Sequence, residues 1–195
     1  MPDEPTADMD EVADHVRREL EAFRARDGRS LHLELEPGTY LVAQAGAVVA
    51  TCIDVVDTGK DGYLFAKLDT GMTEITRPSL YGAQHPIDVM ATDRDAAEVV
   101  FVGPCCESGD ILTPAPGDPE GLGPRWVPRP RVGDLVIVGG TGAYCAAMST
   151  INYYSYPQAA EVMLDSDGSL RLIRRRQSFD QMLANEVEAE PRLSP

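Results

Sequence analysis

Residues 103–110 hold the densest group of chemically useful side chains in the chain, Gly-Pro-Cys-Cys-Glu-Ser-Gly-Asp, directly after the apolar run 99–102. A thiol can give a proton to carbon, and a carboxylate is the natural partner of an amine. Loops held by rigid strands are where such chemistry usually lies. The pattern therefore predicts a strand that delivers a Cys-Glu pair into a reactive turn.

Two other segments have the same form, an apolar run followed by a glycine-containing turn. Glu36, Gly38 and Thr39 follow the run 31–35, and Gly-Thr-Gly-Ala-Tyr at 140–144 follows the run 135–138. Glycine lets a backbone approach a phosphate closely, and a tyrosine hydroxyl is an uncharged donor. Each turn alone is common, so the hypothesis of a site depends on the three occurring together.

The elements that must position these turns change character near residue 38. Asp8 is a predicted helix cap, Gly28 a predicted stop, and a short strand follows at 31–35. One helix and one strand are half of a β/α repeat and cannot bury their apolar faces alone. Residues 1–38 are therefore predicted to be the last piece of a larger α/β domain that continues before Met1. The helix carries apolar residues at three- and four-residue steps, namely Met9, Val12, Val16, Leu20 and Phe23.

After residue 38 the sequence predicts strands without intervening helices, which favours an antiparallel barrel or sandwich. The proline-rich stretch 114–131 is predicted to be a long surface loop. A terminal helix is expected over 178–188, and residues 189–195 are expected to be a disordered tail. The predicted strands cover residues 40–56, 62–69, 96–103, 109–113, 134–139, 159–165 and 169–174.

Composition excludes several classes of partner. The chain has 32 acidic against 17 basic residues and a formal net charge of −15, so neither nucleic acid nor an anionic membrane is expected to bind. It has no apolar run of about 20 residues and no apolar signal core at its start, which favours the cytoplasm. Four cysteines without Cys-x-x-Cys spacing, and only three histidines, argue against a metal site.

In this order along the chain, the motifs resemble the C-terminal part of the diaminopimelate decarboxylase family, fold-type III enzymes that use pyridoxal 5'-phosphate. The resemblance covers residues 9–185. It implies a mainly β fold: an antiparallel Greek-key-type β-barrel over 39–188, preceded by a helix-strand remnant of a TIM-type α/β barrel in 1–38. It also implies the conversion of meso-diaminopimelate to L-lysine and carbon dioxide. The expected partners are a small amino-acid substrate and either a second copy of the chain or the missing α/β-barrel half.

The resemblance implies roles for the residues of the first two turns. Glu36 matches the glutamate that keeps the pyridine nitrogen of the cofactor protonated, which makes the ring an electron sink. Gly38 and Tyr144 match residues at the cofactor phosphate, and Tyr144 also reaches the substrate. Thr39 stands where the family has an arginine that contacts substrate or phosphate.

The resemblance also implies the substrate contacts. Arg77 and Tyr81 match the pair that binds the distal carboxylate of the substrate, a task suited to a planar guanidinium and a hydroxyl. Cys106 matches the thiol that returns a proton to the substrate carbon. Glu107 matches the carboxylate that holds the distal ammonium. The tyrosines in the run 152–155 are expected to pack the end of the barrel.

One part of such an enzyme is missing. The chain has two lysines, Lys60 and Lys67, and neither is placed like the lysine that binds the cofactor covalently. The chain alone is therefore expected to be inactive, as a gene-model fragment, a truncated chain or a split subunit. Two alternatives stay open. Thr39 leaves room for a decarboxylase of another basic amino acid or polyamine precursor, and the barrel could be a non-catalytic dimerising module.

Overall fold

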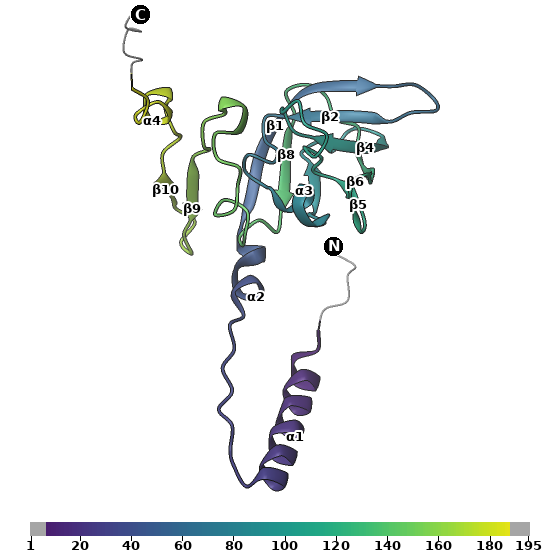
Figure 1. The fold of residues 1–195 in the computed structure, drawn as a ribbon. Helices are drawn as coiled ribbons and strands as arrows, with labels where there is room; N and C mark the ends of the chain where they lie inside the picture. The colour runs from purple at the N-terminus through teal and green to yellow at the C-terminus, as the bar shows by residue number, and fades with distance from the viewer. Residues whose placement is uncertain (1–6, 188–195) are drawn as a thin grey trace, which may run out of the picture.

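The computed structural model describes residues 7–187 and consists of a mainly β body with a long N-terminal arm (Figure 1). The arm begins with α1 (Met9–Asp27), which starts and ends where the sequence predicts. The Asp8 carboxylate accepts the backbone N–H groups of Asp10 and Glu11, at 2.9 and 3.2 Å. The helix ends at Gly28 with a left-handed φ of 69°.

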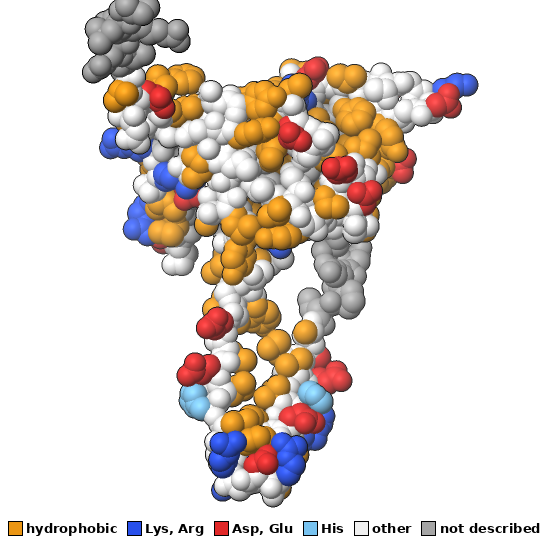
Figure 2. All heavy atoms as spheres, in the orientation of Figure 1, with side chains coloured by type: hydrophobic (Ala, Val, Ile, Leu, Met, Phe, Trp, Pro, Cys, Tyr) orange, Lys and Arg blue, Asp and Glu red, His pale blue; other side chains and the backbone are white. Residues whose placement is uncertain are grey.

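An extended segment, 28–37, runs from α1 back to the body (Figure 1). The strand predicted at 31–35 does not form, and this prediction is wrong. A strand needs a neighbour for its backbone hydrogen bonds, and the segment pairs with no other strand in the described part of the chain. Hydrophobic side chains gather between α1 and this segment, yet no residue of α1 is buried (Figure 2).

Two short helical turns, α2 (Gly38–Val42) and the 3-10 turn η1 (Ala43–Ala45), lead into strand β1 (Ala47–Asp57). The strand predicted from residue 40 therefore begins later than expected. The helical turns are held by a distant loop, because the N–H of Gly142 donates to the Ala43 carbonyl at 2.9 Å. The adjacent N–H of Thr141 donates to the Gly46 carbonyl at 3.0 Å.

The body is a six-stranded sheet of order β3-β8-β1-β2-β4-β7, and its edge strands β3 and β7 come into contact, so that the barrel nearly closes. The mainly β fold is confirmed. The sheet is mixed rather than antiparallel, because β2 and β4 run parallel, with Leu64 opposite Val99. The connection between them, residues 69–95, is long enough to return the chain to the same end. The remaining strands are β2 (Leu64–Leu68), β3 (Ile87–Val89), β4 (Ala96–Val102), β7 (Arg125–Pro128) and β8 (Leu135–Gly139).

The proline-rich stretch 114–131 is not a structureless loop. It contains β5 (Pro114–Ala115), β6 (Asp118–Leu122) and β7, which pairs with β4 at the edge of the sheet. Edge strands tolerate proline because one row of their backbone groups needs no partner. The strand expected at 109–113 is reduced to one bridge between Val102 and Ile111.

A hairpin of β9 (Glu161–Leu164) and β10 (Leu170–Arg174) lies beside the barrel and outside its sheet (Figure 1). The terminal helix α4 (Phe179–Met182) is shorter than the predicted range 178–188. The tail predicted at 189–195 lies outside the described residues. The domain boundary at residue 38 and the Greek-key arrangement stay predictions.

The core fills the inside of the barrel. Its members come from every long strand of the sheet and from the turn before α3 (Arg77–Tyr81). Burial of these aliphatic and aromatic side chains is the main stabilising contribution to the fold. The largest fully buried apolar side chains are Phe101, Leu68, Ile75, Leu112, Val99, Val100, Val136 and Val138.

Candidate active site at one end of the barrel

The Cys-Glu turn leaves the barrel after β4 and is organised around Asp110, which is buried at 3% exposure. One carboxylate oxygen of Asp110 accepts the N–H of Met72 at 2.7 Å, and the other accepts the N–H of Cys105 at 2.8 Å. Burial raises the pKa of Asp110, while these two N–H groups act to lower it. One side chain therefore joins the turn at 103–110 to the turn that precedes α3.

The two adjacent cysteines differ in their surroundings. Cys105 is buried, and burial is the first cause that raises its pKa to about 12, followed by the charge of Asp110. Cys105 therefore stays a thiol near neutral pH. Cys106 is exposed at the tip of the turn, as the alternation of side chains in extended backbone allows.

Glu107 is exposed and its carboxylate is held at both oxygens. Oε1 accepts the N–H of Gly109 at 3.1 Å, and Oε2 accepts the hydroxyl of Tyr153 at 3.2 Å. The backbone N–H of Gly109 is the first cause of the lowered pKa of Glu107, and the Tyr153 hydroxyl is the second. An ionised, solvent-facing carboxylate can receive a cationic group such as an ammonium.

Two tyrosines that the sequence analysis assigned to packing contact this turn. Tyr153 reaches Glu107, and the hydroxyl of Tyr154 donates to the Cys106 carbonyl at 2.9 Å. Their rings meet edge to face with centroids 5.0 Å apart. The sequence offered one signal, the polar tips of two adjacent tyrosines in a turn-rich run, but it did not show which distant residues they would reach.

Helix α3 carries the next pair of predicted residues, Arg77 and Tyr81, and packs against the Cys-Glu turn through Ser79, whose hydroxyl donates to the Gly109 carbonyl. Tyr81 points outward and is 61% exposed. Arg77 is half-buried. Burial is the first cause at both of its titratable neighbours, since it lowers the pKa of His85 and raises the pKa of Cys145, and the positive charge of Arg77 acts to lower both. The structure thus places Cys106, Glu107 and the two α3 residues around one end of the barrel.

His85 lies inside this end of the barrel at 2% exposure. Its Nδ1 is 3.0 Å from the Gly139 carbonyl, which makes Nδ1 the protonated nitrogen of a neutral ring. Burial is the first cause of its lowered pKa. The ring is thereby attached to Gly139 at the end of β8, directly before the loop that holds Tyr144.

Tyr144 follows the glycine-rich turn at the end of β8 and is 56% exposed, with a left-handed φ of 55°. Gly142 packs so tightly on the preceding segment that an added Cβ would lie 1.8 Å from the Val42 carbonyl oxygen. This contact places the loop of Tyr144 against α2. Glu36, just before α2, and Gly38 and Thr39, its first two residues, are exposed, and a Cβ at Gly38 would meet nothing within 4 Å.

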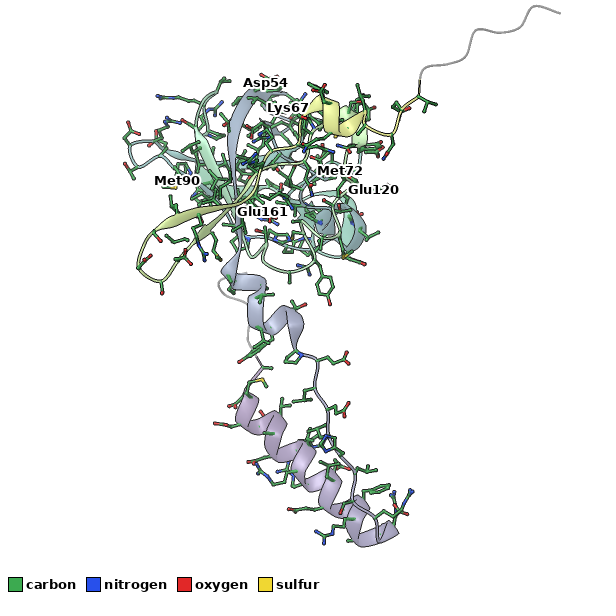
Figure 3. All side chains as sticks on the ribbon, turned by 90° about the vertical axis from the view of Figure 1, so that its left-hand side faces the viewer. Asp54, Lys67, Met72, Met90, Glu120 and Glu161 are labelled. Carbon is green, nitrogen blue, oxygen red and sulfur yellow. The ribbon has the colours of Figure 1, made fainter. Side chains whose placement is uncertain are left out.

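These residues suit the cofactor that their motifs imply. A free carboxylate at Glu36, open space at Gly38 and the exposed phenol of Tyr144 lie on two segments that hydrogen bonds hold together. Neither lysine lies among them. Lys60 is in the turn between β1 and β2, and Lys67 is on β2, in the barrel and apart from α1 (Figure 3).

An open cavity of about 390 Å³ adjoins the Cys-Glu turn, and Lys67, Glu107 and Asp110 are among the residues that line it. The described residues contain no group of three or more side chains able to hold a metal ion. None of the helices in the same part of the chain is both long and apolar enough to span a bilayer.

Comparison with known proteins agrees with the motifs. Residues 14–142 match the C-terminal sheet domain of pyridoxal-dependent decarboxylases. Diaminopimelate decarboxylase of Streptomyces coelicolor is 41% identical over 203 residues, which cover 100% of this chain and 44% of that protein. The Escherichia coli K12 enzyme of the same name is 38% identical over 166 residues, which cover 82% of this chain and 38% of that protein.

Solved structures of the same family also resemble this chain. A crystal structure of diaminopimelate decarboxylase has a TM-score of 0.81 at 34% identity, over 93% of this chain and 43% of that one. The Helicobacter pylori enzyme complexed with L-lysine has a TM-score of 0.76 at 27% identity, over 93% of this chain and 40% of that one. The chain thus spans less than half the length of these relatives. It belongs to the pyridoxal-dependent decarboxylases and corresponds to their C-terminal sheet domain.

Proposed function

We propose that this chain is the C-terminal portion of a diaminopimelate decarboxylase, which converts meso-diaminopimelate to L-lysine and carbon dioxide. The observation that carries the proposal is the exposed Cys106–Glu107 pair on a turn packed against α3. On that turn Cys106 would be the proton donor and Glu107 the carboxylate that binds the ammonium, and Arg77 and Tyr81 of α3 would complete the site. The similarity to proteins named diaminopimelate decarboxylase also supports the proposal.

The substrate would be recognised at its distal end by charge. Glu107 is ionised and would receive the distal ammonium, while Arg77 and Tyr81 would bind the distal carboxylate. A site that needs both groups discriminates against amines that lack the carboxylate, because the guanidinium would then be left without its partner. Thr39 and Tyr144 would also contact the substrate.

Pyridoxal 5'-phosphate would supply an electron sink for the bond that breaks when carbon dioxide leaves. In this chain Glu36 would hold the pyridine nitrogen protonated, and Gly38 and Tyr144 would contact the phosphate. Cys106 would deliver a proton to the substrate carbon from the solvent-facing tip of its turn. The lysine that anchors the cofactor would come from the rest of the enzyme, so this chain alone would be inactive.

The partner we propose is either the α/β-barrel half of the enzyme or a second copy of the chain, in the cytoplasm. The arm supports an association of this kind, because Met9, Val12 and Leu35 are exposed at 47%, 46% and 71%. Neighbouring apolar side chains that are exposed together are usually covered in an assembled protein.

The test uses the longer protein that carries this sequence as its C-terminal portion. We expect Cys106→Ala to lower kcat with little change in KM, because proton delivery is lost and binding is not. We expect Glu107→Gln to raise KM about tenfold or more, since a charged partner of the ammonium is lost. Asp88→Asn, an exposed change on β3, is the control and should alter neither.

Two outcomes would overturn the proposal. One is a full-length protein that releases no carbon dioxide from meso-diaminopimelate but does so from ornithine, arginine or lysine, which the substitution at Thr39 leaves open. The other is a Cys106→Ala variant with unchanged kcat. Release from a mixture of Cys106→Ala with a variant lacking the anchoring lysine would further show that the site is shared between two subunits.

A further inference from the structure

The turn that follows the Tyr144 loop has an unusual backbone. Asn152, Tyr154 and Ser155 all have left-handed φ angles, of 63°, 55° and 59°, although none is glycine. Such residues are uncommon, and the surrounding structure must hold them in place. Tyr154 and Ser155 lie in the short turn η2 (Tyr153–Ser155), and Asn152 directly precedes it.

Side chains on both flanks fix this turn. The Asn152 amide donates to the Tyr156 carbonyl at 3.1 Å and to the Gln177 side-chain oxygen at 2.5 Å. The same Gln177 oxygen accepts the N–H of Gln158 at 3.0 Å. On the other flank, the Thr150 hydroxyl donates to the Met72 carbonyl at 3.0 Å.

The fixed turn delivers two hydroxyls to the predicted site. Tyr153 donates to the second oxygen of Glu107, whose first oxygen is already held by the Gly109 N–H. Tyr154 donates to the carbonyl of Cys106, and this bond fixes the peptide between Cys106 and Glu107. Both site residues are therefore oriented from outside their own turn, while both residues stay exposed.

We propose that Tyr153 and Tyr154 are positioning residues: Tyr153 sets the direction of the Glu107 carboxylate, and Tyr154 sets the backbone that carries Cys106. The inference rests on the proposed function only for its effect on turnover, because the geometry itself can be tested in the chain alone. The left-handed backbone of the turn fixes where the two phenols lie, since a turn with ordinary φ angles would place them elsewhere.

The electrostatics agree with this arrangement. The hydroxyl of Tyr153 helps to lower the pKa of Glu107. Burial is the first cause that raises the pKa of Tyr153, followed by its hydrogen bond to Glu107 and then by the charge of Glu107. The other titratable or charged groups around Glu107 are Cys105, Cys106, Asp110, Tyr154 and, on the cavity wall, Lys67.

The first experiment is a carbon-detected NMR titration of the Glu107 carboxyl in this chain and in Tyr153→Phe, which removes one oxygen and keeps the ring. We expect the pKa of Glu107 to rise toward the ordinary glutamate value. Tyr156→Phe is the matched control in the same stretch of chain, because its hydroxyl bonds to no described residue, and it should leave that pKa unchanged. Equal melting temperatures of the three proteins would show that the fold is intact.

The second experiment measures kinetics in the longer protein. We expect Tyr153→Phe to raise KM for meso-diaminopimelate about two- to tenfold with kcat nearly unchanged, the effect of losing one hydrogen bond in binding. Tyr154→Phe should lower kcat more than it raises KM, because it acts on Cys106. The Tyr156→Phe control should match the parent protein in both constants.

The two experiments separate the two proposals. A Glu107 pKa that is the same in Tyr153→Phe and in the parent overturns the positioning role, and so does an unchanged KM in an active enzyme. If the longer protein decarboxylates no amino acid, the proposed function falls, and the carboxyl titration alone then decides whether Tyr153 positions Glu107.

Discussion

Removing the carboxylate of Asp110 should destabilise the fold more than any exposed acidic substitution. In Asp110→Ala the N–H group of Cys105 loses its acceptor in a buried place, and that of Met72 in a partly buried one. Each such orphaned group costs about 1–3 kcal/mol. In the parent protein, the cost of burying the charged carboxylate offsets part of the stability that its two hydrogen bonds contribute. The raised pKa of Asp110 agrees with this cost. We therefore expect a net loss of about 2–4 kcal/mol in the free energy of unfolding.

Asp110→Asn should lose only part of this stability. The amide oxygen can still accept one N–H, but the amide nitrogen then faces a second donor, so the loss should be about 1–3 kcal/mol. The closeness of Gly103 leaves little room for the side chain to turn away, since a Cβ there would lie 2.2 Å from the carboxylate oxygens. The alanine variant should therefore be the less stable of the two.

The assay is urea unfolding of the chain followed by far-ultraviolet circular dichroism, with the midpoint and the slope fitted separately. Asp88→Asn, on the exposed face of β3, is the control and should stay within about 0.5 kcal/mol of the parent. An Asp110→Ala protein as stable as this control would refute the reasoning. So would an asparagine variant that is less stable than the alanine variant.

Three further predictions concern other parts of the same end of the barrel. Iodoacetamide should modify Cys106 alone in the native chain, because the other three cysteines are buried, and mass spectrometry that finds a second modified thiol before unfolding would contradict this. Gly142→Ala should loosen α2, because the new Cβ would overlap the Val42 carbonyl oxygen; faster amide exchange over 38–46 is the measurement, and unchanged exchange would count against it. The free energy of unfolding should fall as the pH drops below about 6.5, because His85 takes up a proton in the unfolded state but not when it is buried in the folded state. Urea unfolding at several pH values should show a flatter pH dependence for His85→Gln. An equal pH dependence in the variant and the parent would contradict this prediction.

A feature could be predicted from the sequence when the residues that determine it are neighbours along the chain, and not when they are far apart in the sequence. Helix α1 was predictable because Asp8 and Gly28 act on their own neighbours. The strand at 31–35 was not, because its existence depends on a partner segment, and no strand of residues 7–187 pairs with it. The parallel pairing of β2 with β4 was missed for the same reason, since it is decided by the path of the connection rather than by either strand.

In the candidate site, too, the local motif could be predicted and the contacts with distant residues could not. The motif at 103–110 predicted Cys106 and Glu107 as site residues, and the structure packs their turn against α3, where the Ser79 hydroxyl donates to the Gly109 carbonyl. The partners of these residues were not visible, because Tyr153 lies 46 positions away from Glu107 and is joined to it only by the fold. The proline-rich stretch misled for a related reason, since prolines at a sheet edge cost no hydrogen bond.

The position of β1 in the sheet bears on how the protein reaches its structure. Its two neighbours are β2, the next strand along the chain, and β8, which pairs Ala47 with Gly139. The second pairing closes a loop of nearly half the chain, and such non-local contacts slow folding to milliseconds or longer. During synthesis the barrel cannot close until β8 has left the ribosome. Until then the apolar face of the β1–β2 hairpin stays open to other chains, which makes this interval the stage most exposed to aggregation.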